Sequence, residues 1–186
     1  MKARIMKAFL EEVQEKSMKF TMDDLAKRLG ISKRTLYEQF GSKADILDAI
    51  IDSTLQEFDE KTEAIMQSPH LTLIEKIKKT ITVIPKYNDF YTWQILEQMK
   101  KSYPDHWARI HAALNEWDDL QELIKQGIQE GVIADYSVPL LMKLIIEAAN
   151  STMDRQFFLK NRITVEEALD EIVDILLYGM VKVDSM

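Results

Sequence analysis

Residues 21–43 read TMDDLAKRLGISKRTLYEQFGSK, and this stretch decides the fold of the N-terminal region. Thr21 followed by Asp24 is a capping-box pattern that predicts the start of a helix. Gly30 suits the left-handed position that ends such a helix, and Ser32 is placed to cap a second short helix at once. Two short helices with a tight, glycine-containing connection have the length and chemistry of a helix-turn-helix.

The second helix of this motif has two chemically different sides. Ile31, Leu36 and Phe40 supply an apolar side that can anchor it. The opposite side carries polar and cationic residues, namely Lys33, Arg34, Thr35, Tyr37 and Gln39. A helix that reads DNA needs this arrangement, because its back must be held while its front reaches bases and phosphates.

The charge of the chain is unevenly distributed. The formal net charge of the 186 residues is −7, but residues 1–50 hold 10 Lys or Arg and 8 Asp or Glu, while residues 51–186 hold 14 and 23. Residues 27–43 carry five cations against one acid. Because salt screens charges beyond about 10 Å, a local basic patch can contact phosphate on an acidic protein. On charge alone, however, a solvated helix face is the favoured interpretation of the patch.

Composition favours an all-α fold. Glycine occurs only 5 times and proline only 4 times. Cysteine is absent, and its absence excludes disulfides, thiolate metal sites and a cysteine nucleophile. Apolar periodicity and capping residues predict about nine helices, with no convincing strand. They are expected at residues 2–16, 21–30, from 32, from 42, from 72 to 85, at 89–101, 105–130 and 137–160, and from 164. No secretory signal or membrane span is apparent, so a cytoplasmic location is expected.

Two C-terminal helices are candidates for a homodimer interface. Residues 138–149 are apolar in almost every direction around the helix axis, and residues 172–177 are nearly as apolar. Such a helix must be covered on all sides, which favours a two-fold interface over a core helix of a monomer. The predicted interface residues are Leu141, Ile145, Ala149, Ile172, Ile175 and Leu176.

The stretch from Phe20 to Lys43 resembles the tetracycline-repressor (TetR) family of bacterial one-component regulators. It contains the family's threonine before helix 2, Leu-Ala pair, Gly-Ile-Ser turn, Thr-Leu-Tyr step, phenylalanine and Ser-Lys opening of helix 4. It departs from the pattern at Gln39, where the family usually has His or Tyr, and at residues 16–19, where it usually has a glycine. The resemblance implies a DNA-binding three-helix domain at residues 1–46, joined through a long fourth helix to an effector-binding and dimerisation domain at residues 47–186.

The resemblance also implies roles for individual residues. Thr21, Tyr37 and Lys43 look like phosphate contacts, and Thr21 also caps helix 2. Ser32, Lys33, Arg34 and Thr35 are expected to face the groove, and Gln39 is suited to contact phosphate or adenine. For Lys27 and Arg28, a solvated face and a phosphate contact are both plausible interpretations.

By the same resemblance, the body senses a small molecule and the protein is a ligand-responsive regulator, in the usual case a repressor released from its DNA operator. Aromatic and methionine residues gather in the central and later parts of the chain, and they suit an apolar pocket. An ordinary aromatic core is the alternative for each of them. The candidate pocket residues are Tyr87, Phe90, Trp93, Met99, Trp107, Trp117, Met142, Asn150 and Met153.

Other functional classes fit the sequence less well. Asp118, Asp119 and Glu122 form a single acidic group where metal-dependent prenyl-transfer enzymes need two. His106 and His111 are five residues apart and do not share a helix face, so neither a metal site nor a cofactor is expected. A helical protein–protein adaptor explains the apolar C-terminal helices but leaves the cations of residues 27–43 unexplained.

Overall fold

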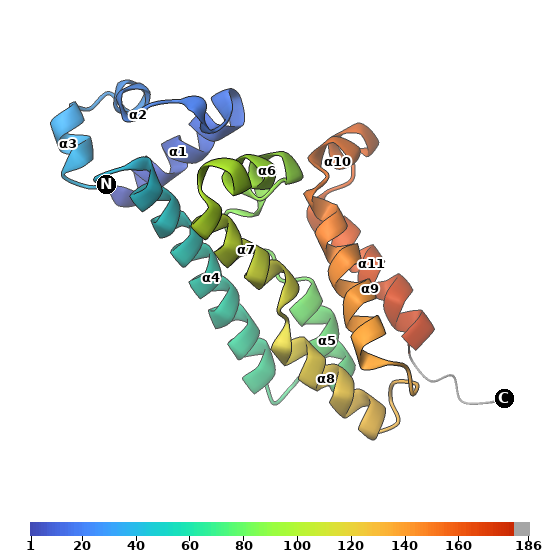
Figure 1. Cartoon of the computed structure of the whole chain (residues 1–186). Coiled ribbons are helices and arrows are strands. Elements are labelled where there is room, and N and C mark those ends of the chain that lie inside the picture. The colour runs from blue at the N-terminus through green and yellow to red at the C-terminus, as the bar shows by residue number, and fades with distance from the viewer. Residues whose placement is uncertain (181–186) are drawn as a thin grey trace. The chain divides into compact units, whose positions relative to one another are not determined.

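The computed structural model describes residues 1–180 and is built from eleven α-helices, with no β-strand among those residues (Figure 1). The helices are α1 Lys2–Lys16, α2 Met22–Leu29, α3 Lys33–Tyr37, α4 Lys43–Gln67, α5 Leu73–Ile81, α6 Trp93–Ser102, α7 Pro104–Asn115, α8 Asp118–Gln129, α9 Val138–Asn150, α10 Arg155–Asn161 and α11 Val165–Met180. Short 3₁₀ turns lie at η1 Ser17–Lys19, η2 Asn88–Phe90 and η3 Ser151–Met153. Within the described range, no helix combines the length and the apolarity needed to cross a membrane.

Three predicted helix starts are confirmed by reciprocal hydrogen bonds of capping threonines. The Thr21 hydroxyl accepts from the Asp24 amide at 3.2 Å, and the Asp24 carboxylate accepts from the Thr21 amide at 2.9 Å. The same reciprocal pattern opens α5 at Thr72 and α11 at Thr164. These caps satisfy backbone amides that have no partner within the helix. The helix expected from residue 89 instead begins at Trp93, capped by Thr92, and Ser137 makes no side-chain cap bond at the start of α9.

Two of the expected helices are each divided in two, so nine becomes eleven. The predicted helix at residues 105–130 breaks at Glu116 and Trp117, and α8 begins afresh with two acidic residues in its first turn, a placement that the helix dipole favours. The predicted helix at 137–160 ends where Ser151 and Thr152 donate to helix carbonyl oxygens, and Asp154 then caps α10. Hydroxyl groups that bond the preceding turn compete with helix continuation.

The first compact unit comprises Met1–Glu57 and Pro85–Ala112. Its core lies between α1, α2 and the start of α4, where Phe9 meets Phe20 edge to face with ring centroids 5.2 Å apart. Helix α6 packs against η1, and the Met18 amide donates to Gln98 Oε1 at 3.0 Å. The N-terminal helices therefore share a compact unit with α6, well outside the expected 1–46 segment. Where the functional division of the chain lies remains a prediction.

The second compact unit comprises Phe58–Ile84 and Ala113–Met186. In its described part, α5 packs against α8, α8 against α9, and α9 against α11 (Figure 1). Their buried aliphatic side chains form one core that includes Ile77, Ile124, Ile145 and Val173. Because α4 begins in the first unit and ends in the second, it is a continuous covalent connection between them.

Candidate nucleic-acid interface

The helix-turn-helix is held by a glycine turn and a buried apolar back. Gly30 ends α2 in the left-handed conformation, with φ 64°, which costs glycine nothing because it has no Cβ. The Ser32 hydroxyl accepts from the Thr35 amide at 3.0 Å and thereby starts α3. Leu25 and Leu36 are completely buried, so α3 has a fixed orientation on α2.

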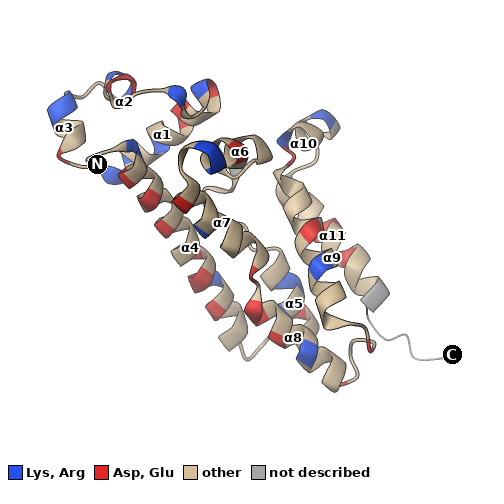
Figure 2. Ribbon diagram, viewed as in Figure 1, with Lys and Arg blue, Asp and Glu red and all other residues tan. Residues whose placement is uncertain are grey.

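The opposite side of α3 is exposed and cationic (Figure 2). The Arg34 side chain is 89% exposed, and its Nε donates to Glu38 Oε1 at 3.0 Å. Lys33 forms an ion pair with Asp23, and Tyr37 is 50% exposed. Exposed ion pairs contribute little free energy. Both cations can therefore exchange a carboxylate for a phosphate at small cost.

The remaining sequence-predicted DNA contacts take part in the local architecture. Thr21 is exposed, and its hydroxyl donates to Asp24 Oδ2 at 2.7 Å. The hydroxyls of Ser32 and Thr35 lie 2.8 Å apart at the start of α3. Gln39 is half-buried just after α3, with its backbone amide donating to the Leu36 carbonyl. Thr21 thus lies at the start of α2, and the other three residues lie on α3 or directly beside it.

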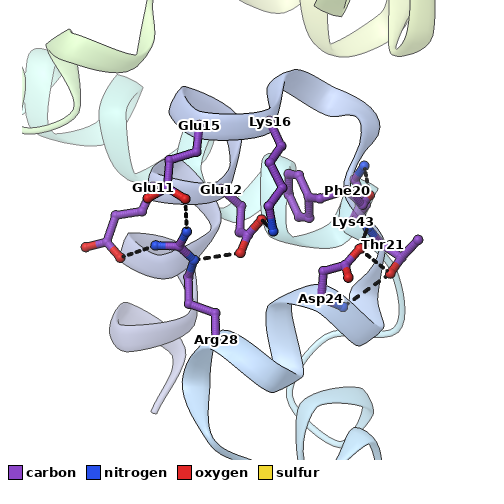
Figure 3. Close-up of polar contacts among 9 residues, drawn as sticks. All are labelled: Glu11, Glu12, Glu15, Lys16, Phe20, Thr21, Asp24, Arg28 and Lys43. Carbon is purple, nitrogen blue, oxygen red and sulfur yellow. Dashed lines mark hydrogen bonds and ion pairs between the residues drawn. The ribbon is translucent and has the colours of Figure 1, made fainter.

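Arg28 is directed at three carboxylates of α1 (Figure 3). Its Nε lies 2.6 Å from Glu12 Oε1, one terminal nitrogen lies 3.4 Å from Glu11, and the other pairs with Glu15. The sequence allowed two interpretations of Arg28, a solvated side chain and a phosphate contact, and these ion pairs match neither. Arg28 instead links α2 to α1. Helical spacing does not predict these contacts, because the partners are 13 to 17 positions away in the sequence.

The buried carboxylate at the centre of this network is ionised. Burial of Glu12 by itself raises the pKa, but hydrogen bonds from Arg28 and from Lys16, whose Nζ lies 2.9 Å from Oε2, outweigh burial and lower the pKa below its usual value. Glu12 can therefore stay charged although it is almost completely covered, since a buried charge persists when it is paired.

Lys43 points into the first unit (Figure 3). Its Nζ donates to the carbonyl oxygens of Met18 and Phe20 at 2.6 and 2.7 Å and lies 4.2 Å from the centre of the Phe20 ring. Burial lowers the pKa of this ammonium group. The lysine that the sequence resemblance assigned to phosphate therefore also fixes the segment between α1 and α2.

The sequence that forms this helix-turn-helix matches a known protein family. Residues 5–61 match the model of the bacterial regulatory proteins of the tetR family. A curated relative, the uncharacterized HTH-type transcriptional regulator YvaF of Bacillus subtilis (strain 168), is 29% identical over 181 residues, covering 97% of this chain and 95% of that protein. The chain therefore carries the DNA-binding domain of the TetR family at residues 5–61. It is accordingly a DNA-binding transcriptional regulator.

Solved TetR-family structures share the fold over nearly the whole chain. KstR2, a ketosteroid transcriptional regulator of Mycobacterium tuberculosis, superposes with a TM-score of 0.76 at 18% identity, covering 97% of this chain and 95% of that one. PfmR from Thermus thermophilus superposes with a TM-score of 0.77 at 23% identity, covering 94% and 97%. The all-α prediction is thereby confirmed.

The residues predicted to line an effector pocket of this TetR-family protein divide between the two units. Phe90 and Met99 lie in the core of the first unit, which also contains Tyr87, Trp93 and Trp107, and Trp93 is exposed. The second unit contains Trp117, Met142, Asn150 and Met153. Met142 belongs to the aliphatic core, Trp117 packs against it, and Asn150 Nδ2 donates to the Leu114 carbonyl at 3.2 Å. The structure therefore does not bring the nine residues together in one unit.

The residues predicted for the dimer interface also separate into two groups. Leu141, Ile145 and Ala149 are buried within the single chain. Ile172 and Leu176 are half-buried, and Ile175 is 72% exposed. On α9 and α11, the exposed large apolar side chains that were not predicted for the interface are Leu140, Leu144 and Tyr178. A helix that is apolar all round carries no signal of which side its own core covers.

Proposed function

We propose that this TetR-family regulator binds its operator as a homodimer through the exposed side of α3 and releases it when a small molecule binds the second unit. The observation that supports the DNA contact is an exposed cationic side of α3 backed by the fully buried Leu36. Arg34, Lys33 and Tyr37 are the proposed groove and phosphate contacts. The adaptor alternative leaves their exposure unexplained.

The proposed dimer interface is the exposed apolar face of α9 and α11. Leu140 and Leu144 are one helical turn apart on α9, and Ile175 and Tyr178 are nearly one turn apart on α11. These two helices pack together within the chain. Pairing this face with its two-fold copy buries all four side chains, and it sets the separation of two α3 helices, which must be about 34 Å to enter successive major grooves.

Release by an effector follows from linkage. An effector that binds better to the spacing that the two α3 helices have without DNA weakens the binding of DNA. By linkage, DNA weakens the binding of that effector by the same factor. Helix α4 is suited to carry this coupling because it extends from the helix-turn-helix unit into the second unit.

DNA binding is tested by fluorescence anisotropy with a duplex taken from upstream of the protein's own gene, titrated at several salt concentrations. We expect binding that weakens steeply with salt, and a loss of roughly tenfold or more for Arg34→Ala with a reduction of the salt slope by about one. Lys160→Ala on α10 is the matched control, because this exposed cation lies outside the helix-turn-helix. Binding that is independent of salt, or equal in the two variants, contradicts the assignment.

The interface is tested by light scattering coupled to gel filtration. Leu144→Glu places a charge in the proposed interface and is expected to yield monomers. Leu159→Glu, at an exposed leucine of α10, is expected to leave the dimer intact. Equal elution of the wild-type protein and Leu144→Glu places the interface elsewhere.

A further inference from the structure

The second unit contains three buried polar groups that have no hydrogen-bond partner among the described residues: the hydroxyls of Thr62 and Thr80 and the indole N–H of Trp117. The two threonines are only 4% and 3% exposed. Buried polar groups in folded proteins are nearly always paired, and leaving one unpaired is costly.

Another buried threonine of α4 shows the usual outcome. Thr54, which is 5% exposed, donates to the Ile50 carbonyl at 2.8 Å and accepts from the Tyr91 hydroxyl at 2.9 Å. Thr62 lies two turns further along the same helix without either kind of partner among the described residues. Thr62 therefore has a buried hydroxyl with the capacity for a further hydrogen bond.

Two lysine hydrogen bonds join α4 to α5 and to the segment that follows α5. After the turn at residues 68–72, α5 runs back along the end of α4 (Figure 1). Lys61 Nζ donates to the Ile84 carbonyl at 2.8 Å, and Lys76 Nζ donates to the Met66 carbonyl at 2.6 Å. Thr62 and Thr80 lie between these two contacts along the chain, on the two antiparallel segments that the contacts join.

Trp117 belongs to the same region. On α5, Thr80 shares the buried face with Ile77 and Ile81. These two isoleucines are members of the aliphatic core against which Trp117 packs, at the start of α8. Thr80 and Trp117 thus border the same apolar core, and Thr62 lies in the same compact unit.

The chemistry of the three groups selects a class of ligand. An indole N–H only donates, and a threonine hydroxyl can donate. No Lys, Arg, His, Asp or Glu is buried among the described residues of the second unit, and the flanking ammonium groups of Lys61 and Lys76 are bound to backbone carbonyl oxygens. A charged ligand group would therefore gain little compensation. We propose that the three groups bind a neutral, largely apolar effector through an accepting oxygen of the carbonyl type. This inference rests on the effector-release part of the proposed function and names the chemistry of its ligand.

The first test compares the unliganded variants Thr62→Val, Thr80→Val and Thr54→Val by thermal unfolding. Valine keeps the shape of threonine and removes the hydroxyl. We expect unchanged or higher midpoints for Thr62→Val and Thr80→Val, because an unpaired hydroxyl is removed, and a decrease of roughly 2–4 °C for Thr54→Val. A decrease of the same size in all three means that the hydroxyls are already satisfied, and it overturns the inference.

The second test follows the indole resonances of the ¹⁵N-labelled full chain, with Trp117→Phe providing the assignment. The probes are cyclohexanone and methylenecyclohexane, which have similar shapes and differ in the accepting oxygen. We expect cyclohexanone to move the Trp117 signal but not that of exposed Trp93. Its affinity should fall at least roughly tenfold in a Thr62→Val Thr80→Val protein and should be unchanged in Thr54→Val. Equal shifts with both probes, or none with cyclohexanone, overturn the inference.

These outcomes are separable from a failure of the proposed function. If the protein binds its duplex with the expected salt dependence while the two probes behave alike, only the ligand chemistry is wrong. If the protein binds no duplex, the regulator proposal fails whatever the probes do.

Discussion

Arg28 Nε of α2 lies 2.6 Å from Oε1 of Glu12 on α1, and this ion pair holds the helix-turn-helix against the helix that precedes it. The carboxylate is buried and also bound by Lys16, whereas the guanidinium reaches two further acids at the surface. Removing one member of such a pair leaves the other charge without its main compensation.

We therefore expect Arg28→Gln to reduce thermal stability while leaving the salt slope of DNA binding unchanged, because this cation is bound within the protein. Lys27→Gln, at the neighbouring exposed position, is the control and is expected to have almost no effect on stability. A double-mutant cycle with Glu12→Gln should reveal non-additive midpoints. Additive effects would show that the two side chains are not energetically coupled.

Lys43→Met is expected to impair DNA binding through the positioning of η1 rather than through loss of a phosphate contact. The substitution removes the donors to the Met18 and Phe20 carbonyls and keeps most of the apolar stem. Anisotropy titrations should show weaker binding with an unaltered salt slope, accompanied by a lower unfolding midpoint. A slope that falls by about one unit, as for Arg34→Ala, would instead identify Lys43 as a phosphate contact.

Stability is expected to fall at acidic pH because of the capping carboxylates. The backbone amide and then the hydroxyl of the capping threonine lower the pKa of Asp24, Glu75 and Glu167 below their usual values of 3.8 for Asp and 4.5 for Glu. The unfolded chain then binds more protons than the folded one, so their stabilisation is complete above about pH 4.5 and is lost as pH falls through the folded pKa values.

Thermal midpoints measured between about pH 3 and pH 7 test this expectation. The midpoint should be nearly flat near neutrality and should drop on the acid side, and Glu75→Gln should make that drop shallower by removing one titrating cap. A midpoint that rises on acidification would contradict the sign of these shifts.

Gly127→Ala is expected to destabilise the second unit by about 1–2 kcal/mol. A Cβ at this position would lie 2.6 Å from Cδ1 and 2.9 Å from Cγ1 of Ile133, which is buried in the core. The overlap outweighs the helix propensity of about 1 kcal/mol that alanine gains over glycine. Denaturant unfolding of Gly127→Ala in an Ile133→Ala background should show a much smaller additional loss, and an equal loss in both backgrounds would refute the clash.

The sequence by itself determined the local structure and the DNA-reading motif. Thr21, Ser32, Thr72 and Thr164 announce helix starts because a cap is completed within three residues, and Gly30 announces a stop for the same local reason. The apolar positions of α2 and α3 follow from helical period, so the exposed side of α3 was predictable before any packing was known.

The partners of residues that are distant in the sequence depend on how the helices pack. Arg28 and Lys43 look alike as surface cations in the sequence, yet one meets carboxylates of α1 and the other meets carbonyl oxygens near η1. Likewise, α9 is apolar on every side, and only packing showed that Ile145 faces its own core while Leu144 stays exposed. Periodicity reports that a side chain avoids water, but which surface covers it depends on elements far away along the chain.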